Sequence, residues 1–135
     1  MSQTFDTKGA IVLDESLPTW QKVNVAAFLF SGFGTVGEPY RDADGNEYLP
    51  MLREPVMVFG ADAAGVRRAY ERARGRGVEE LAVFTRELFV TLNDEANRSA
   101  VAAVRADDLD LVGIALRADR KTVDRILDKA RPLSD

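Results

Sequence analysis

Three polar side chains lie close together at the start of an otherwise apolar segment. In TWQKVNVAAFLFSG, residues 19–32, the first helical turn would carry Gln21, Lys22 and Asn24. A lysine can polarise a carbonyl group or stabilise negative charge, and amide side chains can position a substrate. At about 100° per residue, Gln21 and Asn24 share one side of the helix and Lys22 projects elsewhere. A solvated helix start would look the same, so both interpretations stay open.

Two groups of basic residues suggest a second kind of chemistry, because arginine can pair with phosphate through two hydrogen bonds. The first group lies on a predicted helix and its exit, and comprises Arg67, Arg68, Arg72, Arg74 and Arg76. The second follows the last predicted strand, and comprises Arg117, Arg120, Lys121 and Arg125. The interpretation as a phosphate-contacting patch gains support if both groups lie at the same edge. The neighbouring Glu71, Glu79 and Glu80 favour a solvated helix face instead.

Two short motifs match ligand-binding loops in their letters but not in their surroundings. GFGTVG, residues 32–37, has the GxGxxG spacing, but a helix precedes it and Pro39 follows, whereas a dinucleotide loop joins a strand to a helix. DADGNE, residues 42–47, resembles a calcium loop, but Gly45 comes too early for an EF-hand. We therefore predict a flexible loop and a hairpin turn.

The composition excludes several classes of site. The chain has 135 residues, of which 46% are hydrophobic and 30% charged, as expected of one soluble domain spanning residues 1–135. It has no cysteine and no histidine, which excludes Cys/His zinc sites, disulfides, thiol nucleophiles and Ser-His-Asp triads. We expect neither a metal nor a cofactor.

The charge and hydropathy patterns also limit location and partners. The net charge of −4 argues against nucleic-acid binding by bulk electrostatics. No apolar run reaches the roughly 18 residues that span a bilayer, and no signal peptide is apparent. We therefore expect a cytoplasmic protein without membrane contact.

Short apolar runs alternate with helical patterns along the chain. Strands are predicted at residues 10–13, 55–59, 81–84 and 109–116, and helices at about 19–30, 62–75, 94–104 and 119–129. In the first helix, Trp20, Val23, Ala27 and Phe30 share one face, and the other faces are apolar too, so we expect it to be largely buried. In the second helix, which Asp62 can cap, the predicted inward face is Val66, Ala69, Tyr70 and Ala73.

These elements predict a three-layer α/β/α sandwich with a mixed, mostly parallel four-stranded sheet. A β-hairpin with Asp44-Gly45 at its turn is inserted at about residues 39–50, with Tyr40 and Tyr48 on either side. In an open α/β sheet, ligands bind where strands end and helices begin. We therefore expect site residues at 17–24, 60–62 and 85–87, and at 117–121 if the fourth strand runs parallel.

The strand, the lysine-bearing helix and the late apolar strand together resemble the type II peptidyl-tRNA hydrolases over most of the length. The matching features are Ala10 to Leu13, Leu17, Lys22 with the Ala-rich helix, and Leu111 to Leu116 before the helix containing Val123 and Leu127. The stretches TWQKVNVAAF, DADGNEYLPM and DLDLVGIALR are also similar to an uncharacterised bacterial family that looks like a branch of that fold. Where the hydrolases carry an Asp-Ala-Gly-Arg-Thr-like segment, this chain has Phe84-Thr85-Arg86-Glu87-Leu88, so only Lys22 matches residue by residue.

The resemblance implies a divergent hydrolase that acts on a phosphate-bearing or aminoacyl-type ligand, such as a tRNA-linked substrate, without histidine or cysteine. In this hypothesis Lys22 is catalytic, Gln21, Asn24 and Thr85 position the substrate, and Arg86 holds an anionic group. The alternative is a non-catalytic ligand-binding or interaction module that keeps the fold. Its hairpin, with Tyr40, Tyr48 and Met51, would then serve a homodimer or another partner.

Overall fold

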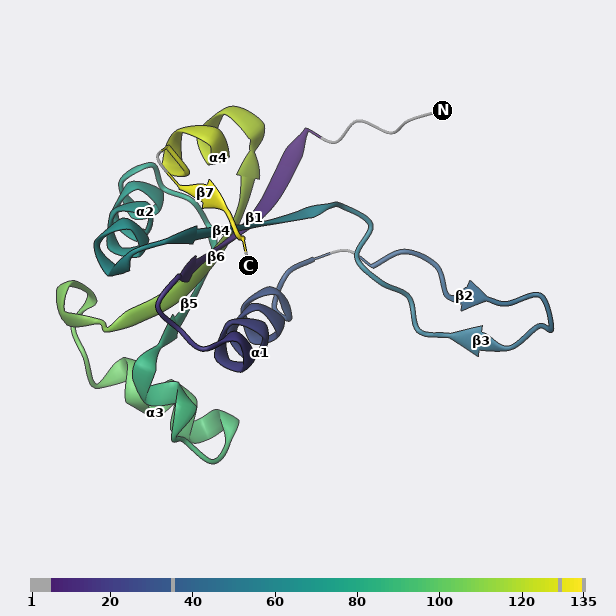
Figure 1. Cartoon of the computed structure of the whole chain (residues 1–135), viewed down its shortest axis with the longest axis horizontal. Helices are drawn as coiled ribbons and strands as arrows, with labels where there is room; N and C mark the ends of the chain where they lie inside the picture. The colour runs from purple at the N-terminus through teal and green to yellow at the C-terminus, as the bar shows by residue number, and fades with distance from the viewer. Residues whose placement is uncertain (1–5, 35, 129, 135) are drawn as a thin grey trace.

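A mixed β-sheet forms the centre of the protein (Figure 1). The computed structural model describes residues 6–34, 36–128 and 130–134. Within these residues the sheet has five strands in the order β5-β6-β1-β4-β7. Their bounds are β1 (Thr7–Asp14), β4 (Val56–Ala61), β5 (Glu80–Thr85), β6 (Leu111–Asp119) and β7 (Arg131–Pro132). The predicted four-stranded, mostly parallel sheet is therefore wrong, because β7 adds a strand and one of the four strand pairings described is parallel.

The direction of β6 decides which chain segments share an edge of the sheet. β1 and β4 pair in parallel, whereas β6 runs antiparallel to β1 and to β5, and β7 runs antiparallel to β4. The carboxyl ends of β1, β4 and β5 therefore meet at one edge, which we call the strand-end rim. Residues 117–121 lie at the carboxyl end of β6, which is at the opposite edge of the sheet. Their predicted place at the rim depended on a parallel β6, and this arrangement does not occur.

Helices cover both faces of the sheet, which makes the three predicted layers (Figure 1). α2 and α4 pack on one face, and α1 packs on the other. The bounds are α1 (Thr19–Phe30), α2 (Ala63–Gly75), α3 (Asp94–Ala102) and α4 (Arg120–Ile126), with 3₁₀ turns η1 (Arg86–Phe89) and η2 (Ala106–Asp108). The predicted end of the last helix, residue 129, lies outside the described residues.

Side chains of β1 alternate between the two cores, as the period of a strand requires. Ala10 and Val12 pack against α2 and α4, whereas Ile11 and Leu13 pack under α1. All four are almost fully buried. Residues 10–13 of β1 are therefore all apolar, because each face of the central strand lies under a helix.

The prediction for α2 is confirmed. Its buried residues are Val66, Ala69, Tyr70 and Ala73. Asp62 caps the helix, since its carboxylate accepts a hydrogen bond of 2.7 Å from the Gly65 N–H. The helix ends before Gly77, which adopts φ +69°, a conformation that glycine reaches without steric cost.

The prediction that α1 is largely buried is wrong. Val25 and Leu29 are the buried residues of this helix, whereas Trp20 is 64% and Val23 is 65% exposed. An apolar pattern on all sides of a helix has no unique inward face, so spacing alone could not choose between them. The helix approaches the sheet closely at Gly113, where an added Cβ would lie 2.9 Å from Val25 Cγ1.

The predicted hairpin projects from the body (Figure 1). β2 (Tyr40–Arg41) and β3 (Glu47–Tyr48) form a sheet of their own, and a further bridge pairs Val36 with Leu52. Gly45 has φ +86°, as the predicted Asp44-Gly45 turn requires. We call residues 36–53 the arm. The glycine-rich loop at residues 32–37 leads into it, although residue 35 of that motif lies outside the described residues.

Candidate functional site

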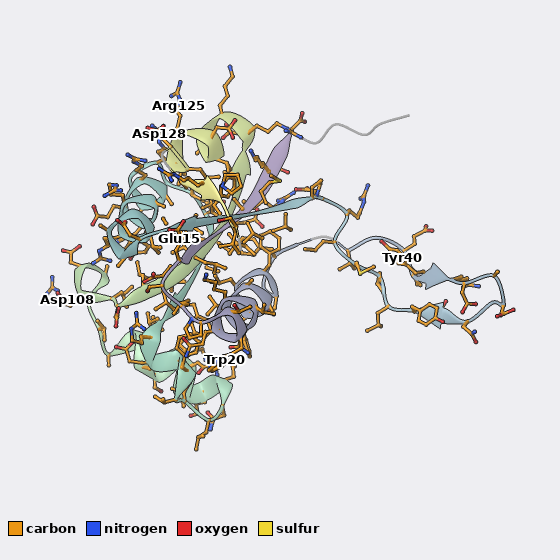
Figure 2. The ribbon with its side chains drawn as sticks, in the orientation of Figure 1. Glu15, Trp20, Tyr40, Asp108, Arg125 and Asp128 are labelled. Carbon is orange, nitrogen blue, oxygen red and sulfur yellow. The ribbon has the colours of Figure 1, made fainter. Side chains whose placement is uncertain are left out.

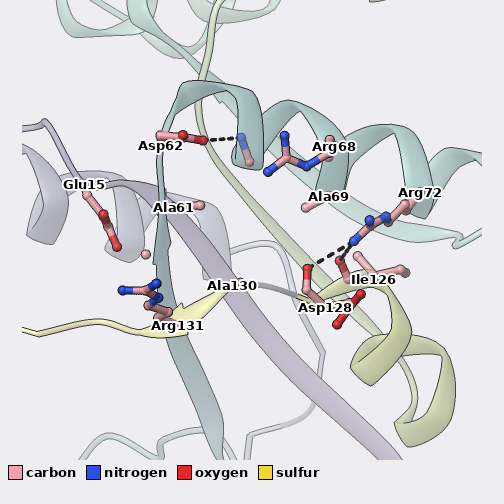
Figure 3. A pocket seen from close by; sticks show the side chains of 12 residues that line it. Glu15, Ala61, Asp62, Arg68, Ala69, Arg72, Ile126, Asp128, Ala130 and Arg131 are labelled. Carbon is pink, nitrogen blue, oxygen red and sulfur yellow. Dashed lines mark hydrogen bonds between the residues drawn. The ribbon is translucent and has the colours of Figure 1, made fainter.

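A cavity of about 320 Å³ opens at the strand-end rim, beside the end of β4 (Figure 3). α2 forms one wall, and the end of α4 and the start of β7 form another. Six charged residues line it, together with small residues such as Gly60 and Ala61: Glu15, Asp62, Arg68, Arg72, Asp128 and Arg131. Its wall is therefore dominated by charged groups.

Gly60 brings the Glu15 carboxylate close to the strand. The Glu15 N–H donates to the Ala61 carbonyl at 2.9 Å, which continues the contact between the chain after β1 and the end of β4. A Cβ added at Gly60 would lie 2.7 Å from Glu15 Cγ and 2.8 Å from its Oε1. A residue larger than glycine would therefore push the carboxylate away from β4.

Two arginines of α2 lie one turn apart and face the cavity. The spacing of Arg68 and Arg72 places both on one side of the helix. Arg72 Nη1 donates to the backbone carbonyl of Asp128 at 3.2 Å and more weakly to that of Ile126 at 3.4 Å. These bonds fix Arg72 against the end of α4 (Figure 3).

Arg68 and Arg131 differ from Arg72 because no described residue pairs with either guanidinium group. Among the described residues, neither makes a hydrogen bond or an ion pair. Arg131 reaches the cavity because β7 pairs antiparallel with β4, with Arg131 opposite Gly60. The two guanidinium groups are therefore available to an anionic ligand, with the N-terminal end of α2 adding its favourable dipole.

The chemistry of the cavity suits a ligand with two kinds of group. Phosphate or carboxylate oxygens would accept hydrogen bonds from Arg68 and Arg131. An amine or hydroxyl would donate to Glu15, which lines the same cavity. Asp62 is already engaged as the α2 cap, so it has less capacity for a ligand. No group of three or more His, Cys, Asp or Glu side chains suited to a metal occurs within the described residues.

The predicted site residues of α1 lie on another part of the rim. Gln21 and Lys22 are half-buried in the first turn, and Asn24 is exposed. The N–H groups of Gln21 and Lys22 both donate to the Pro18 carbonyl, at 3.0 and 3.1 Å. None of the three side chains lines the cavity at β4.

The predicted residues after β5 are placed near the first turn of α1. Thr85 is only 2% exposed, and the Arg86 Nε atom pairs with Asp110 Oδ2 at 3.2 Å. The Trp20 ring meets Phe89 of η1 at 6.2 Å between centroids, which holds α1 against this segment. The structure thus brings the start of α1 beside η1, but it separates these residues from the arginine-lined cavity.

The second basic group divides between two places. Arg117 lies at the opposite edge, where Nη2 pairs with Glu54 at 2.7 Å and Nη1 with Glu80 at 2.8 Å. Hydrogen bonds from Arg117 hold the pKa of Glu54 below its usual value, against the opposing effect of burial. The same contacts raise the pKa of Arg117, so this cluster joins strands rather than binding ligand.

Arg125 lies closer to the first group. With Arg72 and Arg76 it lines a more open cavity of about 470 Å³, which shares Arg72 and Asp128 with the cavity at β4. Figure 2 shows Arg125 and Asp128 at the α4 end of the molecule. The two basic groups therefore meet in part, through α4.

Comparison with known proteins gives a family but no activity. The model of the family described as protein of unknown function (DUF2000) matches residues 7–133. The chain belongs to this family. It is also similar to a solved protein of unknown function from Agrobacterium tumefaciens strain C58, with 40% identity and a TM-score of 0.92 over 97% of this chain and all of the other. A search of curated proteins found no match.

The predicted likeness to an uncharacterised family is thereby confirmed. The comparisons do not show the resemblance to type II peptidyl-tRNA hydrolases, which stays a prediction. No helix within the described part of this DUF2000 domain is long and apolar enough to cross a membrane.

Sequence reasoning placed residues 60–62 of the DUF2000 domain at the rim but missed Glu15 and Arg131. Arg131 stands in a two-residue strand beside Pro132, and a proline argues against a strand. Arg68 and Arg72 belong to the first basic group in the sequence, and their one-turn spacing indicates that they share one side of the helix. Nothing in the sequence separated them from Arg74 and Arg76, which do not line this cavity.

Proposed function

We propose that this DUF2000 domain binds a small ligand carrying a phosphate or carboxylate group in the cavity at the end of β4. The observation that carries the proposal is the pair of guanidinium groups, Arg68 and Arg131, that line one cavity without a partner among the described residues. Because both guanidinium groups line the same cavity, an anionic group bound there would accept hydrogen bonds from them. Glu15 would then select a ligand that also carries a donor group, as an aminoacyl compound does.

The test is calorimetric titration with simple probes that separate the two anions: inorganic phosphate, acetate and glycine. We expect Arg68→Gln and Arg131→Gln each to weaken binding by roughly 10- to 100-fold, since hydrogen bonds to charged groups contribute about 1.5–3 kcal/mol. Arg41→Gln, on the arm, is the matched control and should bind normally. Absence of binding by every probe, or equal affinity in all variants, would contradict the proposal.

Glycine also tests the role of Glu15. If Glu15 accepts a hydrogen bond from the ligand's ammonium group, Glu15→Gln should weaken glycine binding more than acetate binding. Equal losses for both probes would mean that Glu15 acts only through the general charge of the cavity.

A second candidate function is the hydrolysis of a peptidyl- or aminoacyl-tRNA ester at the α1 part of the rim. What supports it is that Lys22 is half-buried at the start of α1 and makes no ion pair with a described residue. Lys22 would polarise the ester carbonyl, with Gln21, Asn24, Thr85 and Arg86 as substrate-binding groups. Single-turnover hydrolysis of peptidyl-tRNA by the wild type, lost in Lys22→Ala, is the expected result. Binding without product would favour the alternative, a non-catalytic binding module. In either case we propose that the protein is cytoplasmic.

We also expect the domain to form a homodimer. The arm exposes Tyr40, Tyr48, Leu49 and Met51, each at 50% or more, and has no helix against its own small sheet. Large exposed apolar side chains gathered on one projecting segment are typical of an interaction surface. Sedimentation velocity over a range of concentrations measures the oligomeric state directly.

A further inference from the structure

We propose that the arm of one protomer docks on the exposed face of α1 of a second copy, and that the partner's arm docks reciprocally. The inference rests on the proposed homodimer and names the two surfaces that form it. A two-fold dimer of this kind is isologous, so each contact occurs twice.

The first surface is an apolar stripe along α1. Trp20, Val23 and Phe28 are 64%, 65% and 58% exposed. Together with exposed Ala27 they lie within one side of the helix at spacings of three, four and one residues. Helices on a protein surface normally present charged and polar residues outward. An apolar outer stripe on a helix whose inner face is already packed indicates that a second surface covers it.

The second surface is one face of the arm. Tyr40 lies opposite Tyr48, and Val36 lies opposite Leu52. The two pairs are an even number of residues apart, so both project to the same side of the ribbon. These four side chains are between 37% and 55% exposed. Figure 2 shows Tyr40 on the arm, which projects from the body, and Trp20 on α1, where one edge of the stripe also contacts Phe89 of η1.

The arm is held in shape before any partner binds. Asp42 Oδ1 accepts hydrogen bonds from the N–H groups of Asp44 and Asn46, at 2.9 and 3.0 Å. Its Oδ2 accepts from Asn46 Nδ2 and from the Tyr48 hydroxyl, at 3.0 and 2.7 Å. A two-stranded hairpin alone is marginally stable in water. The ordered turn lowers the entropy lost when the arm docks.

Length and area both fit a second copy. From Val36 to Asp44 the arm extends roughly 26 Å at about 3.3 Å per residue, whereas the 12 residues of α1 span roughly 18 Å. One arm therefore reaches along the whole helix of a partner. Seven half-exposed large side chains of on the order of 100 Å² each approach the roughly 800 Å² per partner of a standard interface.

Sedimentation velocity with matched variants tests the inference. We expect Tyr40→Asp and Val23→Asp each to raise the dimer dissociation constant at least tenfold, and Leu92→Asp, at a residue 94% exposed outside both surfaces, to leave it unchanged. Circular dichroism should be equal for all, because each site is exposed. A dimer that both variants leave intact would overturn the arm-to-helix contact alone. A wild type that stays monomeric would overturn the homodimer as well.

Cross-linking then tests the pairing itself, since the chain has no cysteine of its own. A mixture of Tyr48→Cys and Val23→Cys proteins should form a disulfide-linked species of dimer mass under mild oxidation. A mixture of Tyr48→Cys and Leu92→Cys proteins should not. Equal yields in the two mixtures would overturn the docking mode. A monomeric wild type that co-sediments with phosphatidylglycerol vesicles would overturn the proposal and assign both surfaces to a lipid surface.

Discussion

The helices α2 and α1 pack on opposite faces of one sheet, but they differ on their outer sides. α2 buries Val66 and Ala69 and presents arginines outward, several of them around the cavity. α1 buries Val25 and Leu29 and presents Trp20 and Val23 outward. The inner faces of both helices cover the sheet. We therefore propose different roles for the two outer faces: small-ligand binding on the α2 side and contact with a second copy on the α1 side.

The largest effect on stability should come from a substitution on the inner side of α1, compared with one on its outer side. Leu29→Ala should lower the free energy of unfolding by about 2–5 kcal/mol, because it leaves a cavity in a core where Leu29 is 3% exposed. Val23→Ala, on the outer side, should change it by less than about 0.5 kcal/mol when measured below the dimer dissociation constant. Urea denaturation measures both. Similar losses in the two variants would mean that the outer stripe is packed within the monomer.

The next effect concerns the close approach of α1 to the sheet. Gly113→Ala should destabilise by about 1–3 kcal/mol, since the new methyl group would lie 2.9 Å from Val25 Cγ1 and 3.1 Å from Leu29 Cδ1. Gly32→Ala is the control, because no atom lies within 4 Å of a Cβ there. Thermal unfolding of both variants checks this. An unchanged midpoint for Gly113→Ala would show that α1 shifts outward easily.

A smaller effect is expected at the start of α2. Asp62→Ala should cost about 1 kcal/mol, because it removes the side-chain bond to the Gly65 N–H. α1 has Pro18 at the same position and no side-chain cap. Thr19→Ala on α1 should therefore cost less than Asp62→Ala on α2. Urea denaturation midpoints of the two variants measure these losses. Equal losses would contradict the prediction.

The smallest effect is local and depends on pH. Hydrogen bonds from Asn46 and then from Tyr48 lower the pKa of Asp42 from 3.8 to about 2. Because the folded pKa lies below the unfolded one, the contribution of Asp42 is complete above pH 4 and is lost as the pH falls through about 2. The amide resonances of Asp44 and Asn46 should move in that window. In Asp42→Asn they should show no such step.

The difference between the helices also explains how far the sequence could predict the fold. α2 alternates arginines and apolar residues with a helical period, so its buried face followed from the spacing. α1 is apolar on every side, and only the packed structure shows that Val25 and Leu29 face the sheet. The direction of β6 was undetermined because a buried strand reads the same whichever way it runs.

The cavity was harder to predict than the layers. Glu15 and Arg131 belong to segments far apart in the chain, and they meet only because β1, β4 and β7 are neighbours. β7 depends on contacts from β4, such as the bond from the Leu133 N–H to the Val58 carbonyl at 3.0 Å. A segment whose pairing comes from another strand rather than from its own residues has little local signal.

The central place of β1 has a consequence for synthesis on the ribosome. Val12 is paired with Phe59 on β4 and with Ile114 on β6, so its two neighbours are translated at very different times. Until β6 emerges, one edge of a strand with a continuous apolar centre has no partner, and such edges favour aggregation. Contacts this distant in sequence also slow folding. The nascent chain should therefore need protection, such as a bound chaperone, until most of the domain has been made.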